Sequence, residues 1–513
     1  HWAVILFKDL TGITSREGLI IAFGSISLFL VVFGNLIEAF ESWYGELFGA
    51  EKDHELSVRL LKNGLNLDVL KFEKKKSAAR AKEIVSDVDR ILVDSLFSML
   101  NLLSESIISI CIVALLLWVD WAVTLVVFFV LFSVHFLIHK VTSVYLSKWG
   151  AEYTKLESSI FCRVWDALNL QKEIKLNGIA DFFVHRFSES SRRMVRNRMG
   201  RSVVSEMPAR LFEVIAFGGV LLIAIYFAVF SSSDTEPITL IGMYAFAAYR
   251  LMPAIASIFS NLEDIWYDSA TLDELVESLM DLDELDAEME DATSFQNTIA
   301  LLDVSFRFSE QSLFHLDAMT LEFPANQMTC IMGKTGCGKS TVLYLISGLY
   351  KPDSGSLQLD GKSVDVYSNI SWQAQVGLVP ASVNILGANL YENIALGLKY
   401  EQINQQKVRD VCVLVELDEH ISSLHNGYDS VYGEDGLSFS SGQVQKVGLA
   451  RALYREPSVL LLDESTDAFD LQTEKNILSR LTQIKGMTII FVSHRPSVME
   501  HAAHVIDLEE RVN

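Results

Sequence analysis

Five long apolar runs occupy the first half of the chain and constrain its fold more than any other feature. They lie at 18–40, 102–119, 121–138, 210–230 and 238–259. Each is about as long as a helix must be to cross roughly 30 Å of hydrocarbon. The core of a soluble domain can bury one such helix, but hardly five. The sequence therefore predicts an all-α transmembrane domain with five spans.

The basic residues between the runs predict how these spans are oriented. Residues 41–90 contain ten Lys or Arg and residues 142–209 contain eleven, whereas the two short connectors contain none. Basic loops stay in the cytoplasm, so we expect both long segments there, as helices that continue below the membrane. The last span then ends in the cytoplasm, and counting back places His1 outside. We expect one more span upstream of His1, which would be the first of six in total.

Composition excludes other classes of protein. A chain of 513 residues is too long for one core, and half of its residues are hydrophobic, which suggests a membrane part joined to a soluble part. The net charge of −23 leaves no basic surface for a nucleic acid. The five Cys are scattered, without a CxxC or Cys/His cluster, and predict reduced thiols instead of disulfides or a zinc site.

An acidic segment separates the two halves. Residues 263–291 contain thirteen Asp or Glu and no Lys or Arg. A solvated helix followed by an acidic linker is the favoured interpretation, and a regulatory or partner-binding segment is the alternative. The predicted organisation is a transmembrane domain at 1–270, an acidic linker at 271–298 and an α/β P-loop nucleotide-binding domain at 299–513.

Strand-like segments follow Ile299, and the third of them, QMTCIMG, runs into GKTGCGKST. The pattern GxxxxGK[ST] between a strand and a helix is typical of a phosphate-binding loop. Its glycines let backbone N–H groups approach phosphates, and the helix start favours negative charge. Lys339 can reach the β- and γ-phosphates, and Ser340 can ligate Mg²⁺. The predicted ATP-binding residues of this loop are Gly333, Lys334, Thr335, Gly336, Cys337, Gly338, Lys339, Ser340 and Thr341.

The segment VLLLDE at 459–464 predicts the partner strand of this loop. Adjacent acids at the end of a buried strand are costly unless a metal or water is there. We expect Asp463 to hold Mg²⁺ through water and Glu464 to polarise the water that attacks ATP. The two motifs together predict an ATPase with ATP and Mg²⁺ as its cofactors.

The order and spacing of these motifs resemble the nucleotide-binding domain of an ATP-binding cassette (ABC) transporter over 299–513, behind an exporter-type membrane domain. The resemblance implies that Phe308, in VSFRF, stacks on adenine, although it could also be a core residue. It implies that His494, in FVSHRPS, is the switch histidine that contacts the γ-phosphate. Asp467–Asp470 corresponds to the D-loop, and GEDG at 433–436 to the segment that senses the membrane domain.

The stretch FSSGQ, 439–443, occupies the position of the family's LSGGQ signature. In the family two cassettes face head to tail, and each signature binds the ATP held by the other. Ser440, Gly442 and Gln443 retain the pattern and are predicted to bind ATP. Phe439 changes the packing, and Ser441 restricts the backbone if that position needs a positive φ. We expect a working loop that binds the γ-phosphate less tightly.

A second departure lies in VGLVPASVNILGANLYENI at 376–394, which aligns with the segment that bears the Q-loop glutamine. That position is Ala381 in this chain. Alanine cannot hydrogen-bond to water or Mg²⁺, so hydrolysis or its coupling to the membrane helices is expected to weaken. The alternative is that Gln375 or a water substitutes for the missing side chain.

The resemblance implies an ATP-driven exporter or flippase half-transporter in the inner (plasma) membrane, with a cytoplasmic nucleotide-binding domain and a second half as partner. A homodimer is favoured, and an asymmetric or inactive half of a heterodimer is the alternative. AYRLMPAIASI at 248–258 and LNLQKEIKLNG at 168–178 are similar to bacterial lipid-linked oligosaccharide flippases. A peptide or bacteriocin exporter remains the other substrate class, and five fused spans disfavour a non-transport ATPase.

Ionisable residues within the apolar runs are expensive unless they face a water-filled cavity, a headgroup or each other. The predicted substrate cavity is lined by Arg250, Glu105 and His135. Arg250 precedes Pro253, which would bend the helix there. We expect it to bind a phosphate of a lipid-linked substrate, or to form an ion pair with Glu105 or Glu213.

Overall fold

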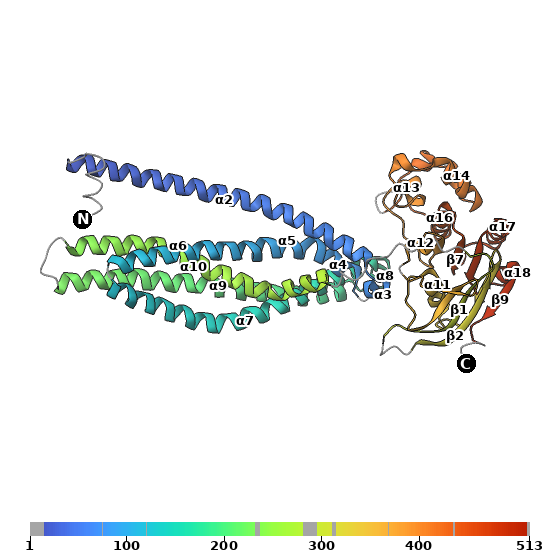
Figure 1. Cartoon of the computed structure of the whole chain (residues 1–513), viewed down its shortest axis with the longest axis horizontal. Helices are drawn as coiled ribbons and strands as arrows, with labels where there is room; N and C mark the ends of the chain where they lie inside the picture. The colour runs from blue at the N-terminus through green and yellow to red at the C-terminus, as the bar shows by residue number, and fades with distance from the viewer. Residues whose placement is uncertain are drawn as a thin grey trace. The chain divides into compact units, whose positions relative to one another are not determined.

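The computed structural model describes residues 15–73, 75–119, 121–230, 236–280, 295–309, 314–367, 369–433 and 437–509. The chain forms two compact units, one comprising 1–67 and 74–284, the other 68–73 and 285–513. The first is helical and the second contains the sheets (Figure 1), which confirms the predicted fold class. Three segments discussed above lie outside the described residues: 231–235, most of the acidic linker (281–294) and 434–436 of GEDG.

Long helices dominate the first unit, and each predicted apolar run lies inside one of them. Two π-helical turns, Glu83–Asp87 and Ile91–Leu96, interrupt the path between α4 and α6. Among the described residues, two helical segments are long and apolar enough to cross a membrane, Glu17–Asn66 and Phe97–Trp118. The helices are α2 (Arg16–Asn66), α4 (Ser77–Lys82), α5 (Val88–Arg90), α6 (Phe97–Val119), α7 (Trp121–Asn169), α8 (Gln171–Asn177), α9 (Ala180–Phe230) and α10 (Glu236–Met280).

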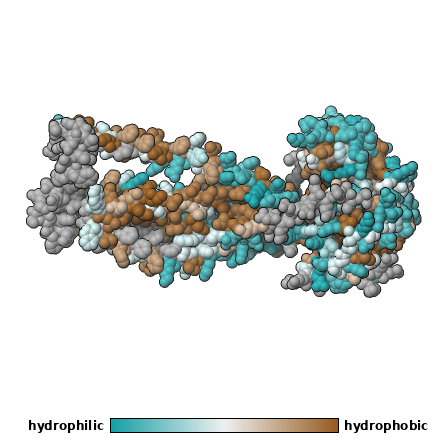
Figure 2. Space-filling model, viewed as in Figure 1, coloured by the Kyte–Doolittle hydropathy of each residue, from teal (hydrophilic) through white to brown (hydrophobic). Residues whose placement is uncertain are grey.

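Helix α10 packs against α6, α7 and α9. The closest approach to α7 is at Gly150, where an added Cβ atom would lie 1.9 Å from the carbonyl oxygen of Tyr267. Helix α2 joins this bundle through its C-terminal part, where Leu60 packs with Val88 and Leu275. Its N-terminal part exposes a continuous apolar surface (Figure 2). That surface is suited to lipid or to a second chain.

A buried ionic network, which the sequence did not predict, joins five helical segments of the first unit: α4, the π-helical turn Glu83–Asp87, α5, α7 and α10. The ammonium group of Lys82 lies 2.6 Å from Asp87 and 3.0 Å from Glu157. The guanidinium group of Arg90 lies 3.1 Å from Glu157 and 2.9 Å from Asp268, which is fully buried. Removing one partner would leave an uncompensated buried charge. The network therefore fixes the register of α4, α5, α7 and α10 relative to one another.

The second unit contains two sheets. A four-stranded antiparallel sheet has the order β2-β1-β4-β5, and a five-stranded parallel sheet has the order β6-β7-β8-β3-β9. All residues of β7 and β8 are buried, as expected for parallel strands covered on both faces. The strands are β1 (Thr298–Arg307), β2 (His315–Pro324), β3 (Met328–Met332), β4 (Ser354–Leu359), β5 (Lys362–Val364), β6 (Val376–Val379), β7 (Val459–Asp463), β8 (Thr488–Val492) and β9 (His504–Asp507).

Helices of the second unit begin at the carboxyl ends of several parallel strands. Helix α11 follows β3, α17 follows β7 and α18 follows β8, so their connecting loops share one edge of the sheet. The helices are α11 (Lys339–Ser347), α12 (Ile370–Gln373), α13 (Leu390–Ile394), α14 (Gln405–Leu414), α15 (Asp418–Ser422), α16 (Ser441–Tyr454), α17 (Leu471–Leu481) and α18 (Pro496–His501).

Six residues that follow α2 pack with the second unit instead of the first. They contain the short helix α3 (Val69–Glu73). The hydroxyl of Tyr367 donates a hydrogen bond to the Asp68 carboxylate, and that of Tyr350 lies 3.5 Å from Oε2 of Glu73. Val69 and its neighbour Leu70 pack against the apolar core of the second unit. The basic residues around this segment predicted a cytoplasmic position, but no pattern in the sequence indicated that it packs with the second unit.

Candidate nucleotide-binding site

The site lies where three adjacent strands of the parallel sheet end. Strand β3 leads into the phosphate-binding loop, β7 ends at Asp463 and β8 leads to His494. Ligands of open α/β sheets bind at the carboxyl ends of the strands, because helix N-termini and exposed loops meet there. The order β7-β8-β3 thus brings residues more than 100 positions apart in the sequence to one edge.

The phosphate-binding loop, 333–341, is held in a shape that its glycines permit. Gly338 has φ +100, and an added Cβ atom would lie 2.7 Å from the ring of Phe314. Lys339 is buried, and its Nζ atom hydrogen-bonds to the carbonyl oxygens of Gly333 (2.8 Å) and Lys334 (3.1 Å). The Lys339 ammonium is therefore placed inside the loop. The side chain of Lys334 points elsewhere, to Glu509 at 2.9 Å.

Ser340 and Asp463 form a pair of oxygen donors beside the loop. The Ser340 hydroxyl donates a hydrogen bond of 3.0 Å to Oδ1 of Asp463. The pKa of the Asp463 carboxyl is raised above its usual value, chiefly by burial. The Ser340 hydrogen bond and the charge of Lys339 oppose this rise. A buried carboxylate beside a hydroxyl is suited to a hard divalent cation, because such ions prefer oxygen ligands.

Glu464 and His494 come together from the ends of β7 and β8. Oε1 of Glu464 lies 3.8 Å from Nε2 of His494, and both side chains are partly exposed. Glu464 has φ +48, a left-handed backbone that is unfavourable for a residue with a side chain. Its N–H donates to the carbonyl of Val492, which helps to hold it there. The arrangement can polarise a water and donate a hydrogen bond to an adjacent anion.

Phe308 is a partly exposed member of an aromatic cluster. Its ring centroid lies 5.1 Å from that of Phe306, 5.7 Å from Phe314 and 5.9 Å from Tyr350. Phe314 also lies against Gly338 of the phosphate-binding loop. The cluster therefore places Phe308 near the loop with ring surface available for stacking. Tyr350, which contacts Glu73 of α3, belongs to the same cluster.

The signature residues form the start of helix α16. Ser440 is its N-cap: its hydroxyl accepts from the N–H of Gln443, whose side chain accepts from the N–H of Ser440 at 2.9 Å. Ser441 begins the right-handed helix, so the expected conflict with a positive φ does not arise. Phe439 stacks on the buried ring of Tyr432 at 3.7 Å. Gly442 has little free space, because a Cβ atom there would lie 3.0 Å from the carbonyl of Ala468.

Gln375 cannot replace the glutamine that is missing at Ala381. Ala381 follows β6 at the edge that carries the phosphate-binding loop, whereas Gln375 precedes β6 at the opposite edge. The Gln375 side chain donates to the carbonyl of Ser371 at 3.0 Å. A strand of four residues separates the two positions, so the prediction that Gln375 substitutes is wrong.

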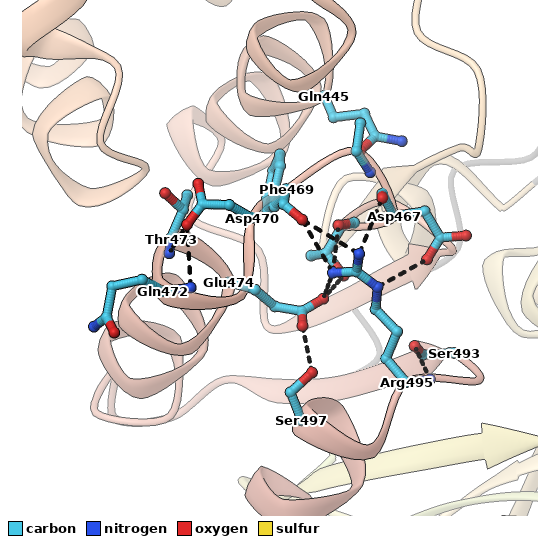
Figure 3. A network of polar contacts seen from close by, with 12 residues as sticks. Gln445, Asp467, Phe469, Asp470, Gln472, Thr473, Glu474, Ser493, Arg495 and Ser497 are labelled. Carbon is cyan, nitrogen blue, oxygen red and sulfur yellow. Dashed lines mark hydrogen bonds and ion pairs between the residues drawn. The ribbon is translucent and has the colours of Figure 1, made fainter.

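Arg495 forms a polar network that was not predicted from the sequence. Arg495 directly follows His494, and its guanidinium group contacts Asp467, Glu474 and carbonyl oxygens of the D-loop (Figure 3). The stretch FVSHRPS shows a cation next to the switch histidine, and this signal could have drawn attention to Arg495. Its buried partner, Glu474, lies on a different element, and no sequence pattern pairs the two.

The residues predicted for the substrate cavity are dispersed over three helices of the first unit. Arg250 lies on α10, Glu105 on α6 and His135 on α7. The side chain of His135 is outside the described part of the structure. Arg250 pairs with Glu38 of α2, at 3.1 Å from Nη2 to Oε1. The predicted pairing with Glu105 or Glu213 is wrong. Glu213 instead lies 3.5 Å from Arg210.

Known proteins resemble this chain in both sequence and fold. Residues 316–467 match the ABC transporter family. Over 458 residues, the chain is 25% identical to the ATP-dependent lipid A-core flippase of Escherichia coli (strain K12) and 24% identical to that of Shigella sonnei (strain Ss046). Each alignment covers 88% of this chain and 78% of the relative. A solved structure of a bacterial Atm1-family ABC exporter with ATP bound has a TM-score of 0.81 at 19% identity, over 96% of this chain and 88% of that chain.

Proposed function

We propose that this chain, whose residues 316–467 match the ABC transporter family, is half of an ATP-driven exporter that moves an amphiphilic, lipid-linked substrate across the plasma membrane. The observation that carries the proposal is the convergence at one sheet edge of Lys339, the Ser340–Asp463 pair and the Glu464–His494 pair. The chain is accordingly an ATPase whose hydrolysis is coupled to transport.

ATP binds along the phosphate-binding loop in this proposal. Backbone N–H groups of 333–341 and the Lys339 ammonium hold the phosphates, and the start of α11 adds favourable potential. Phe308 stacks on adenine through its exposed face. Ser440, Gly442 and Gln443 contact the γ-phosphate of the ATP held by the partner cassette, from the start of α16.

Mg²⁺ fits the donor set beside the loop. Ser340 and Asp463 supply two oxygen ligands, and within the described residues no group of three or more His, Cys, Asp or Glu could hold a metal alone. That donor set is typical of Mg²⁺ shared between a protein and nucleotide phosphates. When bound, the ion neutralises charge on those phosphates.

Hydrolysis depends on two side chains in this proposal. The Glu464 carboxylate accepts a hydrogen bond from the water that attacks the γ-phosphorus, which raises the nucleophilicity of that water. The His494 imidazole donates a hydrogen bond to a γ-phosphate oxygen and stabilises the charge that develops there. Their separation of 3.8 Å allows both to act on the same γ-phosphate.

A homodimer is the assembly that we propose. In the family that this chain resembles, two cassettes face head to tail, and the capped start of α16 gives the altered signature an ordinary helical geometry. Glu464, the residue proposed to activate the attacking water, is present, whereas an inactive half of a heterodimer would not require it. The missing glutamine at Ala381 then affects both sites equally.

The proposed substrate is an anionic lipid-linked molecule. The apolar surface of α2 suits acyl chains. The side chains of Arg250 and Glu38 are each more than half exposed. A substrate phosphate can therefore replace the Glu38 carboxylate as the partner of the Arg250 guanidinium group. The relatives named as lipid A-core flippases support this class.

The proposal is tested with the purified full chain in liposomes. ATPase activity is measured with a phosphorylated glycolipid, an uncharged glycolipid and a basic peptide. We expect Mg²⁺-dependent hydrolysis that the phosphorylated lipid stimulates, that Lys339→Ala abolishes and that Lys334→Ala retains, since the Lys334 side chain is bound to Glu509. Stimulation by the peptide alone would overturn the substrate class, and a parent without ATPase activity would overturn the function.

A further inference from the structure

Glu263 is a buried acid of the helical unit, outside the nucleotide-binding site. It lies on α10, beyond the end of the apolar run 238–259. The residue is fully buried, and neither carboxyl oxygen has a hydrogen-bond partner among the residues that the structure describes. The Ser205 hydroxyl of α9 favours the charged form of the carboxyl, but it does not reach hydrogen-bonding geometry. A carboxylate here would be an unpaired buried charge, which is costly in a protein interior.

The charged groups next to Glu263 have partners of their own. Asp264, which follows it on α10, pairs with the guanidinium group of Arg201 on α9. Asp264 also accepts a hydrogen bond of 3.2 Å from the Ser98 hydroxyl on α6. The repulsion that Asp264 exerts on a Glu263 carboxylate is larger than the attraction by Arg201. The cation that lies closest in this network therefore does not neutralise Glu263.

Tyr267, one turn further along α10, packs on the same cation. The Arg201 guanidinium group lies 4.3 Å from the centroid of its ring, and the ring of Tyr153 on α7 lies at 5.7 Å. Further charged groups in this direction are Arg90 of α5 and Asp268 of α10, which pair with each other at 2.9 Å. The cations at this level of α10 are thus already paired, and close packing depends on an uncharged Glu263.

The surroundings of Glu263 place its titration near neutral pH. Burial is the main reason why the pKa of its carboxyl is raised from an ordinary 4.5 to about 7, and Asp264 adds to the rise against the opposing effects of Ser205 and Arg201. Between these two pH values the folded protein holds a proton that the unfolded chain has released. The stability that this group contributes is complete below about pH 4.5 and is lost as the pH rises through about 7.

We propose that Glu263 is a pH-sensitive switch in the helical unit. Its neutral form lets α9 and α10 pack closely beside Ser205, and its ionised form loosens that crossing and admits water to the carboxylate. Helix α10 is the last described helix before the chain enters the second unit at 285. A looser crossing should weaken the coupling of substrate to ATP hydrolysis, a consequence that rests on the proposed function.

The first test follows thermal unfolding of the purified full chain between about pH 5 and about pH 8.5, a range that spans the titration. The melting temperature of the parent should fall as the pH rises through about 7. Glu263→Gln and Glu263→Leu remove the ionisable group, so each should lose this fall and should melt above the parent at the alkaline end. If both variants show the same fall as the parent, the switch is overturned.

Infrared spectroscopy of the same samples detects the proton itself. The carbonyl stretch of a protonated carboxyl should disappear from the parent as the pH rises through about 7, and this change should be absent in Glu263→Gln. Asp264→Asn removes the repelling charge and frees Arg201 to pair with Glu263, so it should move the midpoint to lower pH. A general loss of stability would not move the midpoint, and a midpoint that stays in place would contradict the proposal.

The matched control is Glu274→Gln, since Glu274 is an exposed acid on the same helix. It should leave both pH profiles as they are in the parent. In liposomes, the ratio of stimulated to basal hydrolysis should fall several-fold across the same pH range in the parent and stay constant in Glu263→Gln. A constant ratio in an active parent would overturn the coupling. A parent without ATPase activity would overturn the proposed function, whereas the unfolding and infrared profiles would still decide the switch.

Discussion

Oε1 of Glu464 lies 3.8 Å from Nε2 of His494, although thirty residues separate the two in the chain. The two side chains are neighbours because β7 and β8 are adjacent parallel strands whose carboxyl ends meet at one edge. The positive φ of Glu464 turns its side chain out of the strand, at the energetic cost of a left-handed backbone. Such strain is retained where the surrounding structure imposes it.

Glu464→Gln should therefore separate binding from turnover. Glutamine has the same shape and fits the same backbone, but it cannot accept a proton. We expect the Kd for ATP to remain near that of the parent, while kcat falls by roughly 10²- to 10⁴-fold. Binding and hydrolysis are measured on the same preparation. Hydrolysis at the parental rate would show that another group activates the water.

Ala381→Gln should restore a side chain at the end of β6 that can hydrogen-bond to water. We expect substrate-stimulated hydrolysis to rise more than basal hydrolysis, since the glutamine would link the nucleotide to the membrane helices. The matched control is Gln375→Ala at the opposite edge of the sheet, which should change neither rate. If both rates stay constant in Ala381→Gln, this loop plays no part in coupling.

Tyr367→Phe should weaken the docking of α3 without disturbing the nucleotide site. The substitution removes the hydroxyl that donates to Asp68 and keeps the ring. We expect basal hydrolysis close to that of the parent and a several-fold loss of substrate stimulation, measured in liposomes, in keeping with about 1–2 kcal/mol for a hydrogen bond to a charged group. Asp68→Asn should act in the same direction. A loss of basal hydrolysis in both would indicate damage to the fold of the second unit instead.

Arg250→Ala should abolish stimulation by a phosphorylated lipid and leave basal hydrolysis intact, if Arg250 binds substrate. Because Arg250 and Glu38 are both more than half exposed, the pair should add little to stability. Glu38→Gln should leave stimulation in place, since it frees the arginine. The contrary outcome is a lower melting temperature in both single variants. If the double variant Arg250→Glu with Glu38→Arg then restores the melting temperature, the two residues form a structural ion pair.

Gly150→Ala should destabilise the helical unit, because the new methyl group would collide with the carbonyl oxygen of Tyr267, 1.9 Å from its position. We expect a loss of about 1–3 kcal/mol, as in other overpacked cores. Gly64→Ala in α2 is the control: no described atom lies within 4 Å of that methyl position. It should be neutral or gain up to about 1 kcal/mol from helix propensity. Thermal unfolding of the full chain compares the two, and equal melting temperatures would contradict the close crossing.

The sequence by itself determined the features that depend on neighbouring residues. A glycine-rich loop between a strand and a helix has few alternatives, so the loop at 333–341 and the helix that follows it were readable from the sequence. Apolar runs of sufficient length fix helices in the same way, because a backbone in lipid must satisfy its own hydrogen bonds. These two kinds of pattern together predicted a helical domain and, after it, an α/β domain.

Only the tertiary structure decided which distant side chains meet. The pairing of Arg250 with Glu38, and of Arg495 with Glu474, depends on how helices and loops pack in three dimensions. Strand direction placed Gln375 at the edge away from the nucleotide site, which a linear alignment does not reveal. The physical reason is that a charged or amide side chain reaches only a few ångströms. Its partner is therefore chosen by the register of packed elements, and packing is a property of the whole fold.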